Sequence, residues 1–172
     1  MAQVIQAAEG DLAELSNLAG AIWRACYPGI ISMEQIEYML ADMYSLETLR
    51  GDICRRGIRY DRLLVAGSFV GFAGYGATEQ PAVFKLHKIY LLPKWHGHGL
   101  GSLLLRHCEV ETIKAGGTSL LLTVNKKNNK AMAAYLRNGF VVTDAVVTDI
   151  GGGFVMDDYI MTKKLKNPAT AP

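Results

Sequence analysis

The feature that most restricts how this chain can fold is a run of three glycines that alternate with other residues between positions 97 and 101. The apolar segment before it, Val83 to Leu92, reads as a strand stopped by Pro93. Glycine permits positive φ and close backbone approach, and successive N–H groups at a helix N-terminus form an anion site. The pattern therefore predicts a strand, a tight turn and a helix from Leu100 to Lys114, with a diphosphate as the best-fitting ligand.

Two other phosphate-binding patterns fail on context. A Walker A loop needs a Gly-Lys-Ser/Thr ending that the chain lacks. A Rossmann turn follows the first strand of its unit and leads to an acidic residue about 20 positions later, whereas residues 119–124 contain none. A glycine-rich turn without a ligand stays open as the alternative. Lys94, His96 and His98 add positive or polar character to the turn.

The remaining periodicity predicts the order of elements. An edge strand over Gln3 to Ala7 precedes three helices, one capped by Asp11 with Glu14 at its third position, one capped by Ser32, and one over Ser45 to Ile53. Further strands are expected over Leu63–Ala66, Val70–Tyr75, Val83–Leu92, Ser119–Val124, Phe140–Val147 and Phe154–Thr162, and a further helix over Asn129–Arg137. The strand over Ser119–Val124 is apolar enough to be buried on both faces.

This order predicts an α/β fold of the α+β type, with a central, mostly antiparallel mixed sheet and helices on both faces. We expect a single domain over residues 1–165 and a flexible C-terminal tail over residues 166–172, because the tail has no apolar periodicity.

Composition limits the class of function. No apolar run approaches the ~20 residues of a membrane span, and the start of the chain does not resemble a secretion signal. Three widely spaced cysteines favour a reduced, cytoplasmic protein, and a net charge of +2 argues against nucleic-acid binding. Residues 1–60 carry 8 acidic against 5 basic residues, and residues 61–172 carry 8 against 13. That asymmetry suits a cationic substrate and an anionic cofactor; ordinary surface charge explains it equally well.

Two motifs resemble those of the GNAT N-acetyltransferases. Their [Q/R]-x-x-G-x-[G/A] loop falls on residues 96–101, with His96 in place of the usual first residue. Their N-x-x-A-x-x-x-Y-x-x-x-G-F pattern falls on residues 128–140 with every spacing kept. The resemblance covers roughly residues 60–165 and implies a GNAT-type domain that uses acetyl-CoA. Shorter runs, Leu86–Pro93 and Asp158–Met161, look like those of bacterial polyamine (spermidine/spermine) acetyltransferases.

The resemblance also implies where acetyl-CoA binds. The strand backbone at Ile89, Tyr90 and Leu91 would pair with the pantetheine arm, and the N–H of Leu91 would stabilise the oxyanion. The segment from His96 to Ser102 would hold the pyrophosphate, and Asn128 would contact the cofactor. The cofactor-binding residues expected on this basis are Ile89, Tyr90, Leu91, His96, Gly97, His98, Gly99, Leu100, Gly101, Ser102, Asn128 and Tyr135.

Amine acetylation needs a base for the ammonium, an oxyanion donor and an acid for the thiolate. By the resemblance, Tyr135 is the acid; packing in the core is its structural alternative. His87 is the first candidate base, since it is placed on the cofactor strand with the side-chain parity of Ile89 and Leu91 and since imidazole titrates near neutral pH. A partly buried structural histidine is an equal alternative. Glu79 is the second candidate, acting through water.

The resulting prediction is direct transfer of acetyl from acetyl-CoA to a primary amine. The acceptor stays open among a polyamine, an antibiotic, an amino acid and a protein amine, and a GNAT-like domain that only binds acyl-CoA is the alternative from another class. No metal site is expected, because His96 and His98 have no third ligand at a usual spacing. Glu34, Glu37, Glu79 and the Asp157–Asp158 pair are the carboxylates expected near a cationic acceptor, and a homodimer is possible.

Overall fold

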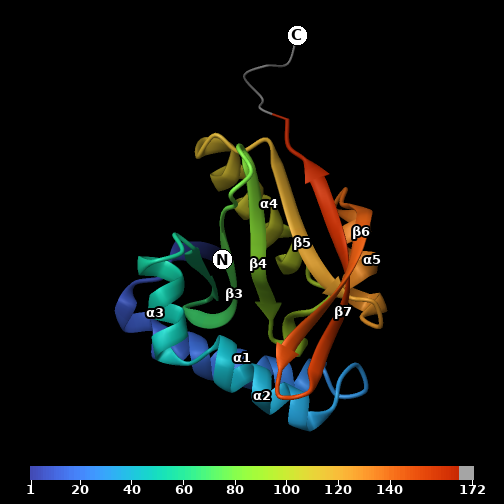
Figure 1. Cartoon of the computed structure of the whole chain (residues 1–172). Helices are drawn as coiled ribbons and strands as arrows, with labels where there is room; N and C mark the ends of the chain where they lie inside the picture. Colours follow the sequence, from blue (N-terminus) through green and yellow to red (C-terminus); the bar gives the residue numbers. More distant parts are fainter. Residues whose placement is uncertain (167–172) are drawn as a thin grey trace.

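Seven strands form one mixed sheet in the computed structural model, which describes residues 1–166 (Figure 1). The spatial order is β1-β2-β3-β4-β5-β7-β6, and only the β4–β5 pair is parallel. The strands are β1 (Ala2–Gln6), β2 (Arg59–Val65), β3 (Ser68–Ala77), β4 (Val83–Leu91), β5 (Ser119–Asn125), β6 (Val141–Gly151) and β7 (Phe154–Lys164). The predicted mostly antiparallel mixed sheet is confirmed. The tail predicted over residues 166–172 lies, except for residue 166, outside the described residues.

Five helices cover the sheet: α1 (Leu12–Cys26), α2 (Met33–Met43), α3 (Leu46–Cys54), α4 (Leu100–Lys114) and α5 (Asn129–Arg137). The hydroxyl oxygens of Ser32 and Ser45 each accept a hydrogen bond of 3.1 Å from the backbone three residues on, as predicted for helix caps. Asp11 occupies the N-cap position of α1, as predicted, but its side chain makes no capping hydrogen bond to that helix. Its carboxylate instead accepts from the N–H of Ala8 at 2.8 Å and closes the 3-10 turn Glu9–Asp11.

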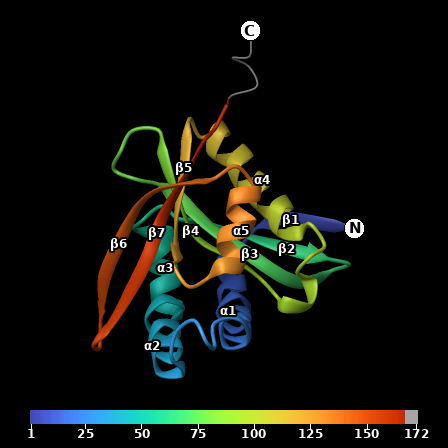
Figure 2. The same cartoon turned by 90° about the vertical axis from the view of Figure 1, so that its right-hand side faces the viewer.

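The two faces of the sheet carry separate apolar cores. Helices α1, α2 and α3 pack with Tyr60 and Phe72 on one face. Helices α4 and α5 pack on the other face against β3, β4, β5 and β7. Figure 2 shows β6 and β7 as a long hairpin at one margin of the molecule. Helices therefore lie on both faces, as the sequence predicted.

Strand β5 is buried on one face only, which corrects the expectation of burial on both. Leu120, Leu122 and Val124 are buried against the α4–α5 core, whereas Leu121 is partly buried and Thr123 is exposed. The cause is that no residue of β5 belongs to the core formed by α1, α2 and α3. The face of β5 that carries Thr123 is left open.

Strands β4 and β5 separate part of the way along their length. Their pairing runs from Val83 to Leu86 on β4 and ends at Leu122 on β5. On its other side β4 stays paired with β3 as far as Leu91. The stretch of β4 after Leu86 therefore presents a backbone edge toward β5 without a strand partner in the described part of the chain.

A β-bulge in β4 lies at the point of separation. Tyr75 of β3 pairs with Leu86, and Gly74, the residue before Tyr75, pairs with Lys88. His87 therefore has no partner on β3 and is the extra residue of the bulge. Leu86 packs in the α4–α5 core, whereas Lys88 is buried on the α3 face. The bulge thus changes which face of the sheet the following side chains occupy.

No helix within residues 1–166 is long and apolar enough to cross a membrane. Cys26, Cys54 and Cys108 are all free thiols, in agreement with the absence of a disulfide framework expected from their spacing.

Candidate active site

The glycine turn has the backbone conformation that its sequence predicts. Gly97 and Gly99 have φ of +81° and +75°, in the left-handed region that favours glycine, and Gly99 is the N-cap of α4. No side chain caps the first N–H groups of α4. A Cβ placed at Gly97, Gly99 or Gly101 would meet nothing within 4 Å. The helix N-terminus therefore has free donors and open space beside it, as an anion site requires.

His96 does not point freely at that space. Its Nε2–H donates to the carbonyl of Leu91 at 2.8 Å, which leaves Nδ1 to accept from the ammonium of Lys130 at 2.9 Å. The residue that replaces the family's usual Gln or Arg thus ties the turn to the end of β4 and to α5. His98 donates from Nδ1 to the carbonyl of His96 at 2.9 Å and is otherwise exposed, so it is the histidine available to a ligand.

The free edge of β4 offers backbone groups at Ile89 and Leu91. The N–H of Leu92 donates to the carbonyl of Val70 on β3 at 2.9 Å. Because the groups of successive residues point to opposite sides in an antiparallel ladder, Tyr90 also pairs with β3, and Ile89 and Leu91 point toward β5. The carbonyl of Leu91 is bonded to His96. The N–H groups of Ile89 and Leu91 and the carbonyl of Ile89 face the gap, whereas Tyr90 contributes its side chain to the α1–α3 core.

Tyr135 lies on α5 and packs in the same apolar core as Ile89 and Leu91 of β4. Its ring packs edge-on against Phe140 at 5.9 Å, and its hydroxyl makes no hydrogen bond within residues 1–166. Burial raises the pKa of Tyr135 to about 12, so the hydroxyl keeps its proton at neutral pH and can donate it. Asn128 caps α5, since its side-chain oxygen accepts from the N–H of Ala131 at 3.1 Å. Its amide nitrogen is the group left for a cofactor.

His87 does not share a face with Ile89 and Leu91, because the bulge interrupts the alternation on which that expectation rested. Besides burial, the charged groups that affect the pKa of its ring are Lys85, Arg56, Asp52 and Lys88, on the α3 side of the sheet. Burial and these neighbouring cations lower the pKa of His87 to about 4. The ring is therefore neutral at pH 7 and a weak proton acceptor.

Glu79 lies far from the glycine turn. It is exposed in the loop between β3 and β4, before Val83, whereas the turn follows Leu91 at the other end of β4. Eight residues of strand span roughly 26 Å. The loop stands beside the end of β4 that remains paired with β5, so Glu79 is remote from the free edge.

Asp158 of β7 is a buried carboxylate that pairs with Asn125 of β5. It is 6% exposed, and its Oδ1 has no hydrogen-bond partner among the described residues. Burial, and then the charge of Asp157, raise the pKa of Asp158 to about 6, while Lys85 and Lys126 oppose the shift. Asp158 is one of the five acids that the sequence predicts near the acceptor, but no local pattern in the sequence indicates that it alone is buried and unpaired.

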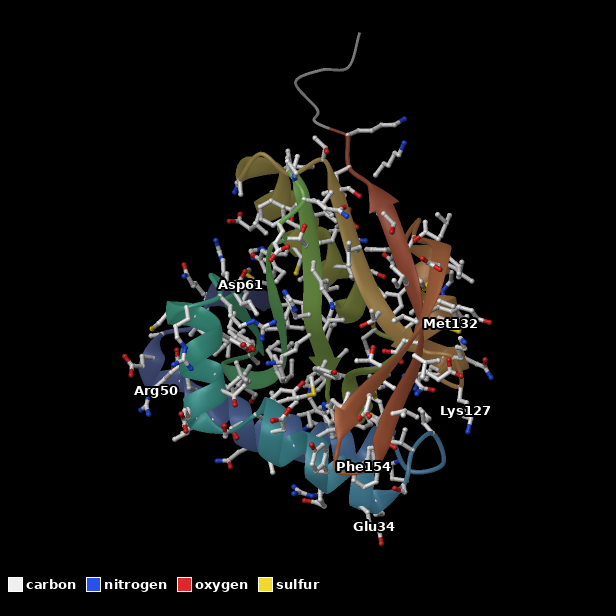
Figure 3. The ribbon with its side chains drawn as sticks, viewed as in Figure 1. Glu34, Arg50, Asp61, Lys127, Met132 and Phe154 are labelled. Carbon is white, nitrogen blue, oxygen red and sulfur yellow. The ribbon has the colours of Figure 1, made fainter. Side chains whose placement is uncertain are left out.

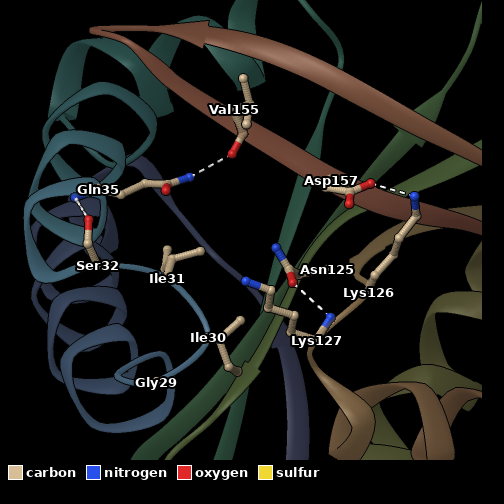
Figure 4. Close-up of a pocket in the computed structure, with 10 residues that line it drawn as sticks. All are labelled: Gly29, Ile30, Ile31, Ser32, Gln35, Asn125, Lys126, Lys127, Val155 and Asp157. Atoms are coloured by element: carbon tan, nitrogen blue, oxygen red, sulfur yellow. Dashed lines mark hydrogen bonds and ion pairs between the residues drawn. The ribbon is translucent and has the colours of Figure 1, made fainter.

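A pocket of about 450 Å³ opens beside Asp157, the neighbour of Asp158 on β7 (Figure 4). Its walls are the α1–α2 loop, the β5–α5 turn and the β6–β7 hairpin. The lining residues are Gly29, Ile30, Ile31, Ser32, Gln35, Asn125, Lys126, Lys127, Val155 and Asp157. Gln35 donates to the carbonyl of Val155 at 2.9 Å, and the hydroxyl of Tyr38 donates to the carbonyl of Ile150 at 2.8 Å. Helix α2 thereby holds the hairpin over the pocket.

Two of the expected acceptor-side acids are already neutralised by ion pairs. Glu37 accepts two hydrogen bonds from Arg24, at 2.6 and 2.7 Å. Asp157 lies 2.5 Å from the ammonium of Lys126. Glu34 is exposed at the outer surface of α2 (Figure 3). Within residues 1–166, no three His, Cys, Asp or Glu side chains are grouped to hold a metal ion.

Known proteins share both the sequence pattern and the fold. The model of the acetyltransferase (GNAT) family matches residues 20–140. A spermidine N(1)-acetyltransferase of Thermoplasma acidophilum is 32% identical over 150 residues, which cover 86% of this chain and 90% of that protein. The crystal structure of the PaiA N-acetyltransferase of the same organism, in complex with coenzyme A, superposes with a TM-score of 0.82 at 28% identity, over 95% of this chain and 99% of that one.

A GCN5-related N-acetyltransferase of Rhodopseudomonas palustris has the same fold, with a TM-score of 0.79 at 18% identity over 95% of each chain. A family match over more than half of the chain, together with a 32% identical relative that covers most of it, agrees with the free β4 edge and the open N-terminus of α4. The chain therefore belongs to the GNAT acetyltransferase family and is an acetyl-CoA-dependent N-acetyltransferase.

Proposed function

We propose that this enzyme acetylates a polyamine such as spermidine by direct transfer from acetyl-CoA. The observation that carries the proposal is the 32% identity to a spermidine N(1)-acetyltransferase over nearly the whole of both chains. The buried carboxylate of Asp158 supports it, because Asp158 pairs with Asn125 of the pocket wall and has no cationic partner among the described residues. A cationic amine is the acceptor that an unpaired carboxylate favours.

In this proposal the cofactor lies along the gap between β4 and β5. The N–H and C=O groups of Ile89 and the N–H of Leu91 take the place of strand partners for the pantetheine amides. The N-terminus of α4, with Gly97 to Ser102, holds the diphosphate. His98 and the side-chain amide of Asn128 are further polar contacts, and His96 acts by fixing the turn.

The chemistry then proceeds without an acetyl-enzyme intermediate. The neutral amine attacks the thioester carbon, and the N–H of Leu91 stabilises the oxyanion. The C–S bond breaks, and Tyr135 donates its proton to the thiolate. His87 is a poor choice of base, because its lowered pKa makes it a weak proton acceptor.

Release of free CoA against a panel of amines tests the proposal. We expect turnover with spermidine and spermine, and an apparent KM that rises with ionic strength, because salt screens the attraction between cation and carboxylates. A neutral aromatic amine and a peptide N-terminus serve as the comparison acceptors. Turnover of a comparison acceptor with none of a polyamine would contradict the polyamine assignment and leave the acetyltransferase activity standing.

A further inference from the structure

The carboxylate of Asp158 has no structural explanation within the fold. It is buried, yet Oδ1 receives no hydrogen bond, and no cation lies within ion-pair distance of it among residues 1–166. Other buried carboxylates of the chain are fully engaged: Asp52 binds Lys88 and Tyr60, and Asp61 binds Tyr75 and His107. An unpaired buried carboxylate costs free energy, so it marks a place where a ligand supplies the missing partner.

The sheet register places Asp158 at the acceptor pocket. It pairs with Asn125 across the β5–β7 ladder, and paired residues project from the same face with Cβ atoms about 5 Å apart. The side chain of Asn125 lines the pocket. Asp158 is therefore next to a residue of the pocket wall, although its own side chain is not among those that line the pocket.

The same register places Asp158 on the face of the sheet that carries Lys85. Lys85 pairs with Leu121, and Leu121 and Asn125 are four residues apart on β5, so both point to that face. The effect of Lys85 on the titration of Asp158 agrees with this placement. Lys85 lies two residues before His87, the extra residue of the bulge at which β4 and β5 part. Leu122, where the β4–β5 pairing ends, pairs with Met161, so Asp158 lies three residues beyond that point, level with the open part of the gap and on the strand next to β5.

We infer that Asp158 is the proton acceptor for the reacting ammonium, an inference that rests on the proposed amine acetylation. The ammonium of the acceptor enters the pocket and becomes the partner that Oδ1 lacks. One N–H bond breaks, and its proton passes to Asp158, directly or through one water. The freed lone pair forms the N–C bond to the thioester carbon, and the C–S bond breaks.

Protons and charge balance over the whole cycle. Tyr135 protonates the departing thiolate and recovers a proton from the acylated nitrogen through solvent. Asp158 releases its proton to solvent before the next turnover. The products are the amide, CoA and one proton.

The Asp158→Asn enzyme tests the inference, with Asp144→Asn as control. Asp144 is an exposed carboxylate on the neighbouring strand β6, so its replacement makes the same chemical change outside the site. The charged groups that act on Asp158 are Asp157, Lys85 and Lys126, and all are unchanged in both variants. Turnover of spermidine is measured by CoA release from pH 5 to pH 9, and CoA affinity by calorimetry.

We expect Asp158→Asn to lower kcat at least about 10²-fold while CoA affinity stays within about threefold. The wild type should lose activity as the pH falls through about 6, where the carboxylate becomes protonated, and the residual activity of the variant should lack that limb. Asp144→Asn should behave as the wild type in both respects.

Retention of kcat by Asp158→Asn, or an acid limb that persists in its residual activity, would overturn the inference. If the variant does not fold, the wild-type profile decides, because a rate independent of pH between 5 and 7 excludes Asp158 as the base. If the wild type acetylates only another amine, the polyamine proposal fails, and the same variants are then compared with that amine.

Discussion

Tyr135 is the residue whose chemistry the surrounding fold defines most directly. Its ring is held against Phe140, and its hydroxyl has no partner within residues 1–166. We expect Tyr135→Phe to lower kcat roughly 10²-fold, because the ring stays and only the proton donor is lost. CoA affinity measured by calorimetry should barely change, since the lost interaction matters in the transition state. Full activity of the variant would assign the proton to water instead.

The burial of the Asp158 carboxylate also leads to a prediction about the stability of the fold. The pKa of Asp158 is raised from 3.8 to about 6, so the folded state disfavours the ionised form. The free-energy cost of ionising Asp158 in the folded protein is absent below about pH 4 and complete above about pH 6. A carboxylate whose pKa is lowered by folding does the reverse and stabilises the fold at high pH. Asp158→Asn should therefore stabilise the fold at pH 7.5 by on the order of 1 to 3 kcal/mol, and much less at pH 4. Denaturant unfolding at the two pH values measures the difference; equal effects at both would contradict the buried, unpaired state of the carboxylate.

At the scale of elements, the N-terminus of α4 is the part that we propose holds the diphosphate of the cofactor. Gly99 is unsuitable for testing it, because φ of +75° makes any other residue strained there. Gly101 is helical and has open space beside it, so a side chain fits the free protein. Gly101→Val should keep the unfolding temperature and weaken CoA binding at least tenfold, because its γ-carbons enter the space of the diphosphate.

Gly101→Ala is the matched control for that change. The family pattern accepts alanine at this position, and alanine favours helix over glycine. We expect calorimetry to show near-normal CoA affinity for the alanine variant. Equal affinity of both variants and the wild type would mean that the turn does not hold the diphosphate.

A buried polar cluster joins α3 to β4 beneath the site. Lys88 donates to Asp52 at 2.8 Å and contacts the hydroxyl of Tyr60, which donates to the same carboxylate at 2.6 Å. Burial lowers the pKa of Lys88, although Asp52 opposes the shift. Because Lys88 directly follows the bulge, this cluster also fixes the point where β4 leaves β5.

Removing one partner of the cluster should be costly. Asp52→Ala leaves a buried ammonium without its carboxylate, and we expect a loss of about 3 to 5 kcal/mol in the free energy of unfolding. The double variant Asp52→Ala, Lys88→Met removes both charges and should lose less than the sum of the two single changes. Additive losses in denaturant unfolding would show that the two groups are not coupled.

At the scale of the whole molecule, the sheet separates the two tasks of the proposed reaction. The α4–α5 face holds the glycine turn and Tyr135. The α1–α3 face, together with the β6–β7 hairpin, forms the pocket. The gap between β4 and β5 connects them, so a cofactor from one face and an amine from the other can meet without either crossing a core.

The sequence by itself determined the order of the elements, the mixed sheet and the conformation of the glycine turn, because these depend on local signals: caps, periodicity and glycines at positive φ. Its resemblance to the GNAT motifs also predicted roles for Tyr135 and for the strand that ends at Leu91, and these roles stay predictions. The sequence misplaced the side chain of His87, because a single extra residue in β4 reverses the face of a side chain and leaves no mark in composition.

Only the tertiary structure decided which carboxylates remain available to an amine. Glu37 and Asp157 are paired with cations, Arg24 of α1 and Lys126 of the β5–α5 turn, whereas Asp158, adjacent to Asp157 in sequence, is buried and unpaired. Neighbours in a strand face opposite sides of the sheet, so two identical residues meet different surroundings. Charge pairing and burial depend on which segments lie together in space, and that is the information that a linear pattern does not contain.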